Sequence, residues 1–101
     1  MKTYEEHISK IDLEVESIVQ RAQSYMQWLD EESVREQIMQ AYEFAREAHK
    51  TDIRLSWEPY ISHPVAATEI LLSLSPDIST IQACFLHDVI AVSYTHLRAH
   101  E

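Results

Sequence analysis

The residues best suited to chemistry are two histidines and an aspartate. His63 stands directly before Pro64, and an adjacent pair, His87 and Asp88, follows in an apolar segment. Imidazole together with carboxylate suits divalent ions such as Mn²⁺ or Fe²⁺. Burying a carboxylate without a partner is costly, and a bound cation removes that cost. The three residues therefore predict a metal site, in preference to a core histidine satisfied by a neighbour.

Four helices are expected to position these side chains, over residues 4–28, about 30–50, 64–74 and 77–90, because apolar residues recur there at gaps of three and four. The chain contains no glycine, which a helical protein tolerates best. Asp30 and Asp77 are expected to cap the second and fourth helices, and Pro64 to occupy the first position of the third. The fourth helix is apolar nearly all round, which predicts the central core helix. We therefore expect an all-α helical bundle.

The predicted inward-facing positions of the four helices can be stated in chain order. They are Ile8, Ile11, Val15, Ile18, Val19, Ala22, Tyr25 and Met26, then Val34, Ile38, Ala41, Tyr42, Ala45 and Ala48, then Val65, Ala66, Ile70, Leu71 and Leu74, then Ile78, Ile81, Ala83, Cys84, Phe85, Leu86, Val89 and Ile90.

Length and charge exclude several classes of protein. The chain has 101 residues, which predicts one domain at most. Its net charge of −9 lacks the basic footprint that non-specific nucleic-acid binding needs. No apolar run approaches the roughly 18 residues of a membrane span. Residues 1–6 lack an apolar segment, so no secretory signal is expected, and the single Cys84 is expected to be a buried thiol in a reducing compartment. We therefore expect a cytoplasmic protein.

Longer motifs around the three candidate ligands carry a resemblance. They are residues 42–49 (YEFAREAH), Arg54, residues 58–65 (EPYISHPV) and residues 85–90 (FLHDVI). Together they cover about half of the chain, and they resemble the N-terminal hydrolase region of the RelA/SpoT family. That family makes and degrades (p)ppGpp in the bacterial stringent response, and its hydrolase region belongs to the wider HD metal-phosphohydrolases. The implied fold is the N-terminal part of an HD-domain bundle.

The resemblance implies an Mn²⁺-dependent hydrolase that removes the 3′-pyrophosphate of the guanine nucleotide (p)ppGpp. His63, His87 and Asp88 match the metal ligands, while Arg54, Ser56 and Tyr60 are expected to contact the substrate. A longer parent would also carry the synthetase region and could associate with ribosomes through regions outside this chain. His49 is expected to support the connector at residues 51–62 and not to bind metal.

Several departures from the family pattern point to an incomplete site. The family signature reads His-Asp-x-x-Glu-Asp, but Ala91 and Val92 stand where the two catalytic acids belong. Leu55 and Trp57 replace a basic residue and a glycine in the connector, and the fourth metal ligand would lie beyond residue 101. We therefore expect residues 1–91 to be a partial HD-type hydrolase domain that is inactive by itself.

The last ten residues do not continue the helical pattern. Residues 92–101 (VSYTHLRAHE) resemble a conceptual translation of sequencing-adapter DNA. They are interpreted as a non-native tail, and we expect them to be disordered or loosely docked.

Two other functions remain open at this stage. The first is an HD-superfamily phosphohydrolase that acts on another nucleotide, since the His-Asp pair alone does not specify the substrate. The second is a non-catalytic helical regulatory module, which the missing acids favour and the intact candidate ligands disfavour.

Overall fold

The computed structural model describes residues 4–49 and 59–99, and they form a bundle of helices. The elements are α1 (Tyr4–Tyr25), α2 (Glu31–Ala48), α3 (Ser62–Leu71), the short 3-10 helix η1 (Leu72–Leu74) and α4 (Ile78–Ala99). No strand occurs among these residues. The prediction of an all-α fold is confirmed.

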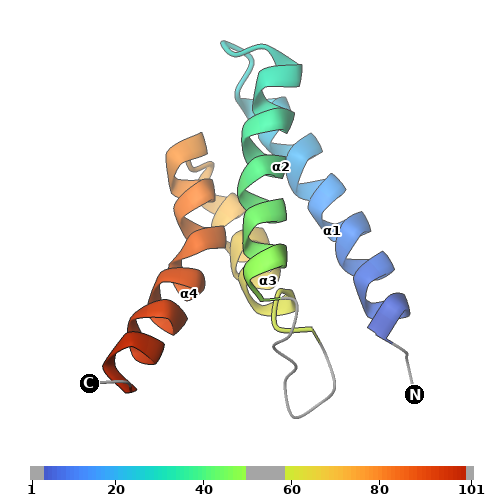
Figure 1. The fold of residues 1–101 in the computed structure, drawn as a ribbon. Coiled ribbons are helices and arrows are strands. Elements are labelled where there is room, and N and C mark those ends of the chain that lie inside the picture. Colours follow the sequence, from blue (N-terminus) through green and yellow to red (C-terminus); the bar gives the residue numbers. More distant parts are fainter. Residues whose placement is uncertain (1–3, 50–58, 100–101) are drawn as a thin grey trace.

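Each of the four long helices packs against two others. α2 lies between α1 and α4, and α3 covers both α1 and α4 from behind (Figure 1). The backbones of the diagonal pairs, α1 with α4 and α2 with α3, do not come within 8 Å of each other in the described chain. A shared core therefore lies between the four helices, and it places the start of α3 beside the middle of α4.

Two predicted caps start the helices where the sequence indicated. Asp30 accepts a hydrogen bond from the backbone N–H of Ser33 at 3.3 Å, and Asp77 accepts one from Thr80 at 2.8 Å. Such bonds satisfy N–H groups that have no partner inside the helix. Between η1 and α4, Ser75 adopts a left-handed conformation with φ 49°, a role that glycine usually fills.

The start of α3 differs from the prediction by two residues. The helix begins at Ser62, so Pro64 is its third residue and not its first. The proline remains compatible with the helix because none of the first four N–H groups has an intrahelical acceptor. The earlier start places His63 inside the first helical turn.

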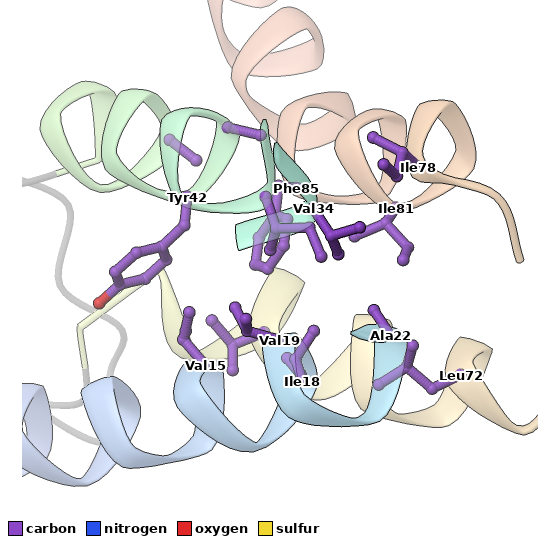
Figure 2. Packing of buried hydrophobic residues seen from close by; sticks show 14 of the residues in the cluster. Val15, Ile18, Val19, Ala22, Val34, Tyr42, Leu72, Ile78, Ile81 and Phe85 are labelled. Carbon is purple, nitrogen blue, oxygen red and sulfur yellow. The ribbon is translucent and has the colours of Figure 1, made fainter. Parts of the chain in front are cut away.

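The core follows the predicted stripe on α1 and α2 closely. The buried apolar residues are Ile8, Ile11, Val15, Ile18, Val19, Ala22, Met26, Val34, Ile38, Ala41, Tyr42, Ala45, Ile61, Val65, Leu72, Ile78, Ile81 and Phe85. Figure 2 shows Phe85 and Val34 pointing toward Val19 of α1. Ala48, predicted to face inward, lies in the last turn of α2 and is exposed.

The predicted inward face of α3 is wrong at three positions. Ala66 is exposed, and Ile70 and Leu74 are 75% and 78% exposed. Thr68 is buried in their place, and its hydroxyl donates a hydrogen bond to the Pro64 carbonyl at 2.7 Å. That internal bond lets a polar side chain occupy the core, so the helix turns a different face inward from the one that hydrophobicity alone indicates.

The prediction that the fourth helix is the central one is also wrong. Among the described helices α4 packs on α2 and α3 alone, and its Ala83 and His87 are exposed. Cys84, predicted to be buried, is partly exposed. Apolar residues all round a helix indicated full burial, but α4 is one wall of the shared core, and among its described side chains the buried ones are Ile78, Ile81 and Phe85.

The helical pattern does not end near Ile90. α4 continues to Ala99, which contradicts the expectation of disorder for the backbone of residues 92–99. The segment contains no proline or glycine, so nothing in it stops a helix once started. The interpretation of residues 92–101 as non-native stays a prediction.

No helix within residues 4–49 and 59–99 is both long and apolar enough to cross a membrane.

Candidate metal centre

The fold brings two of the three predicted metal ligands together. His63 lies in the first turn of α3, and His87 lies on α4. The centroids of their imidazole rings are 6.4 Å apart, and the ring planes meet at 56°. Both side chains are exposed. The packing of α3 on α4 thus places two imidazoles side by side where an ion from solvent can reach them.

The separation of the two rings lies at the upper limit for a shared ion. An imidazole nitrogen binds a transition-metal ion at about 2.1 Å, so the centroids of two imidazoles on one ion lie up to roughly 6.5 Å apart, and they reach that distance only when the two nitrogens are on opposite sides of the ion. The His63 and His87 centroids are 6.4 Å apart, so the two rings would have to move closer together to occupy adjacent positions on one ion. With a carboxylate beside them, the donor set would suit Mn²⁺ or Fe²⁺.

The ring of His87 is oriented by its own helix. Its Nδ1 atom lies 2.6 Å from the carbonyl oxygen of Cys84. A carbonyl can only accept, so Nδ1 carries the proton and donates it, and this geometry assigns the tautomer. The lone pair is then on Nε2. Ligating histidines commonly have this arrangement, in which the second nitrogen donates to a carbonyl.

The structure does not describe the side chain of the third predicted ligand, and two predicted substrate residues lie outside the described residues. Asp88 follows His87 on α4, but its side chain is not described, and Arg54 and Ser56 fall in the segment 50–58. Among the side chains that are described, no group of three or more His, Cys, Asp or Glu residues is placed to hold a metal. The full ligand set and the roles of Arg54 and Ser56 therefore stay predictions.

Tyr60, the third predicted substrate residue, lies between two histidine rings. Its ring centroid is 4.7 Å from that of His49, with an interplanar angle of 31°. On the other side it is 6.3 Å from His63, in an edge-on arrangement at 66°. His49 is 3% exposed and caps the C-terminal end of α2. His49 was expected to support the connector, but this row of rings could not be predicted from the sequence, because only the fold brings the end of α2 to the start of α3.

A buried aromatic pair ties the helix that bears His87 to α2. The rings of Phe85 and Tyr42 meet edge-on, with centroids 6.0 Å apart. The Tyr42 hydroxyl donates to Asp12 Oδ1 at 2.8 Å, and Arg46 pairs with the same oxygen at 3.3 Å. Burial and the hydrogen bond to Asp12 raise the pKa of the Tyr42 hydroxyl, so it remains a donor at neutral pH. Through Phe85, this network holds the His87 end of α4 against α2.

The two positions at which the family has catalytic acids lie on the same helix as His87. Ala91 and Val92 lie on α4, one turn after His87 and Asp88. Carboxylates at these positions would be neighbours of the candidate ligands, because residues three and four apart lie on one side of a helix. Alanine and valine cannot take a proton from water.

Comparisons with known proteins give a family and several relatives of this chain. The HD domain family matches residues 41–100, a stretch that contains the whole row of rings from His49 to His87. The guanosine-3′,5′-bis(diphosphate) 3′-pyrophosphohydrolase of Vibrio cholerae serotype O1 is 51% identical over 55 residues, which are 54% of this chain and 8% of that protein. The bifunctional (p)ppGpp synthase/hydrolase SpoT of Escherichia coli K12 is 45% identical over 75 residues, 74% of this chain and 10% of that protein.

A third relative is a mycobacterial protein. The bifunctional (p)ppGpp synthase/hydrolase RelA of Mycobacterium tuberculosis is 42% identical over 53 residues, 52% of this chain and 7% of that protein. The resemblance to the RelA/SpoT family stated from the sequence motifs is confirmed. The chain matches about a tenth or less of the length of these three relatives.

Proposed function

The chain belongs to the HD domain family, and from that premise we propose that it is the metal-binding part of a (p)ppGpp 3′-pyrophosphohydrolase of the RelA/SpoT type. The observation that carries the proposal is the pairing of His63 and His87 across α3 and α4. The names of the relatives support the substrate, because two of them are bifunctional (p)ppGpp synthase/hydrolases and one is a 3′-pyrophosphohydrolase.

In this proposal His63, His87 and Asp88 hold a Mn²⁺ ion. When bound, the ion supplies Lewis-acid chemistry toward the phosphoryl group and lowers the pKa of water. His87 contributes through Nε2, because its Nδ1 proton is engaged by the Cys84 carbonyl. Arg54 binds a phosphate of the nucleotide through a charge-assisted hydrogen bond, and Ser56 and Tyr60 complete the substrate contacts.

The proton that hydrolysis must remove from water has no acceptor at positions 91 and 92. An aligned general base contributes typically 10²–10⁴-fold to a rate. We therefore expect the 101-residue chain to bind metal but not to turn over (p)ppGpp. A cytoplasmic location, and association of a longer parent with ribosomes, are further parts of the proposal.

Metal binding is tested first. Mn²⁺ is titrated into the wild-type chain and into His63→Ala, His87→Ala and Asp88→Ala, and free ion is followed by EPR. Each substitution is expected to weaken binding at least tenfold, while His7→Ala, which changes a histidine of α1 outside the site, is expected to bind like the wild type. Equal binding by the wild type and His87→Ala would remove the metal site from the proposal.

The activity needs the missing parts. Changing Ala91→Glu and Val92→Asp alone is not expected to restore hydrolysis. The same two changes, combined with the downstream helices of a relative, are expected to give Mn²⁺-dependent release of pyrophosphate from labelled ppGpp. In that protein Arg54→Ala is expected to weaken substrate binding by about 1.5–3 kcal/mol. If that protein cleaved another nucleotide and left ppGpp intact, the proposed substrate would be wrong. Turnover of ppGpp by the 101-residue chain itself would refute the expectation that this chain is inactive.

A further inference from the structure

Four aromatic rings from separate parts of the fold form a continuous row that ends at the candidate metal centre. The rings of His49, Tyr60, His63 and His87 follow one another at centroid distances of 4.7, 6.3 and 6.4 Å. His49 closes α2, Tyr60 precedes α3, His63 lies in the first turn of α3 and His87 lies on α4. The row therefore links the end of α2 to both candidate imidazole ligands.

We propose that His49 is a positioning residue, which holds the Tyr60 ring in place and through it sets the orientation of the His63 imidazole for metal binding. This inference rests on the proposed function, in which His63 is a ligand. His49 itself binds neither metal nor substrate in the proposal.

Burial and stacking at His49 support this role. The side chain is 3% exposed, and its backbone N–H donates to the Ala45 carbonyl at 3.0 Å, so the residue is fixed at the end of α2. Its ring is tilted by 31° from the Tyr60 ring, and the centroids are 4.7 Å apart, within the range of about 4.5–7 Å at which aromatic pairs attract each other. A half-buried tyrosine in contact with a fixed ring has fewer rotamers available than one that faces solvent.

The backbone carries the constraint from Tyr60 to His63. The His63 N–H donates to the Tyr60 carbonyl at 3.1 Å, and the Ser62 N–H donates to the Pro59 carbonyl at 3.1 Å. These two bonds wind residues 59–63 into the turn that leads into α3. The Tyr60 ring then stands edge-on to the His63 ring at 66°, so a rotation of Tyr60 would change the space open to the imidazole. For comparison, His87 is oriented directly by the carbonyl of Cys84.

The test uses the full 101-residue chain and two pairs of variants. His49→Phe keeps a flat ring and His49→Ala removes it. Tyr60→Phe keeps the ring without the hydroxyl and Tyr60→Leu removes the ring. The control is Ile18→Val, a conservative change in the core on α1. Two quantities are measured: the Mn²⁺ dissociation constant by EPR, and the His63 ring signals in metal-free protein by long-range ¹H–¹⁵N NMR, with folding checked by urea denaturation.

The two variants without a ring are expected to bind Mn²⁺ about 10–100-fold more weakly, the usual effect of losing a residue that orients a ligand. They are also expected to shift and broaden the His63 signals. The two variants that keep a ring, and the Ile18→Val control, are expected to resemble the wild type in both measurements. If a loss of stability alone weakened Mn²⁺ binding, the Ile18→Val control would also bind Mn²⁺ more weakly than the wild type.

The outcomes separate the two proposals. If the wild type binds Mn²⁺ and His49→Ala binds it equally well, the positioning role is wrong and the metal site stands. If the wild type binds no Mn²⁺, the metal site is wrong, and the His63 signals then decide the positioning role alone: unchanged signals in His49→Ala would overturn it.

Discussion

Replacement of Phe85 by alanine is expected to cost a large part of the stability of the fold. The side chain is fully buried, and its ring meets the Tyr42 ring edge-on at 6.0 Å. A core Phe→Ala change costs about 3–5 kcal/mol, since apolar contacts are lost and a cavity remains. The edge-to-face pair contributes about 0.5–1.5 kcal/mol beyond the buried area. We expect the free energy of unfolding to fall by about 4 kcal/mol.

A matched control lies next to it in the chain. Leu86 is only partly buried against the core, so Leu86→Ala is expected to cost about 1–2 kcal/mol. The hydrophobic pattern alone treats the two residues as equivalent, and the difference between them is therefore a test of the packing of α4.

The measurement is urea denaturation followed by far-UV circular dichroism. A chain of this length has a stability of roughly 5–15 kcal/mol, so Phe85→Ala could unfold in buffer; Phe85→Leu, which keeps most of the volume, would then supply a measurable midpoint. A loss below about 1 kcal/mol for Phe85→Ala, or equal losses for Phe85→Ala and Leu86→Ala, would refute the packing argument.

Three further predictions concern electrostatics and backbone strain. Hydrogen bonds from Arg35 lower the pKa of Glu16 from its ordinary 4.5, so Glu16→Gln should slightly destabilise the protein at pH 7. The difference in urea midpoint between this variant and the wild type should vanish as the pH falls through the lowered pKa of Glu16. A difference that does not change with pH would contradict this prediction. Burial, and to a lesser extent the nearby Glu14, raises the pKa of Glu69 from 4.5, so Glu69→Gln should stabilise the protein at pH 7. The gain in stability over the wild type should shrink as the pH falls through the raised pKa toward 4.5. Thermal melts at a series of pH values would show or disprove this trend. Ser75→Gly should stabilise by up to about 1 kcal/mol in urea, because φ 49° is strained for serine; a loss of stability would show that the turn carries no strain.

The parts of the candidate site that depend on a short stretch of sequence were predictable. An imidazole before a proline and a His-Asp pair in an apolar segment are visible in the sequence, and the fold places His63 beside His87. The row of rings was not predictable in the same way. His49 and Tyr60 are separated by a polar connector, and their stacking depends on how α2 and α3 are arranged.

By itself, the sequence determined the helices, two of their caps and the core stripes of α1 and α2. These are local properties, because a period of three to four residues and an aspartate at a helix start act within one element. It also determined the family resemblance and the absence of acids at Ala91 and Val92.

Only the tertiary structure decided which face each later helix buries. Thr68 takes the core position that Ile70 was expected to fill, because its hydroxyl is satisfied by the Pro64 carbonyl and the neighbouring helices set the rotation of α3. α4 is a wall of the core and not its centre, since it has neighbours on one side only in the described chain. Packing between helices is non-local, so the rotation of a helix, and with it the meeting of His63 with His87 and Tyr60 with His49, depends on contacts that no single segment of sequence contains.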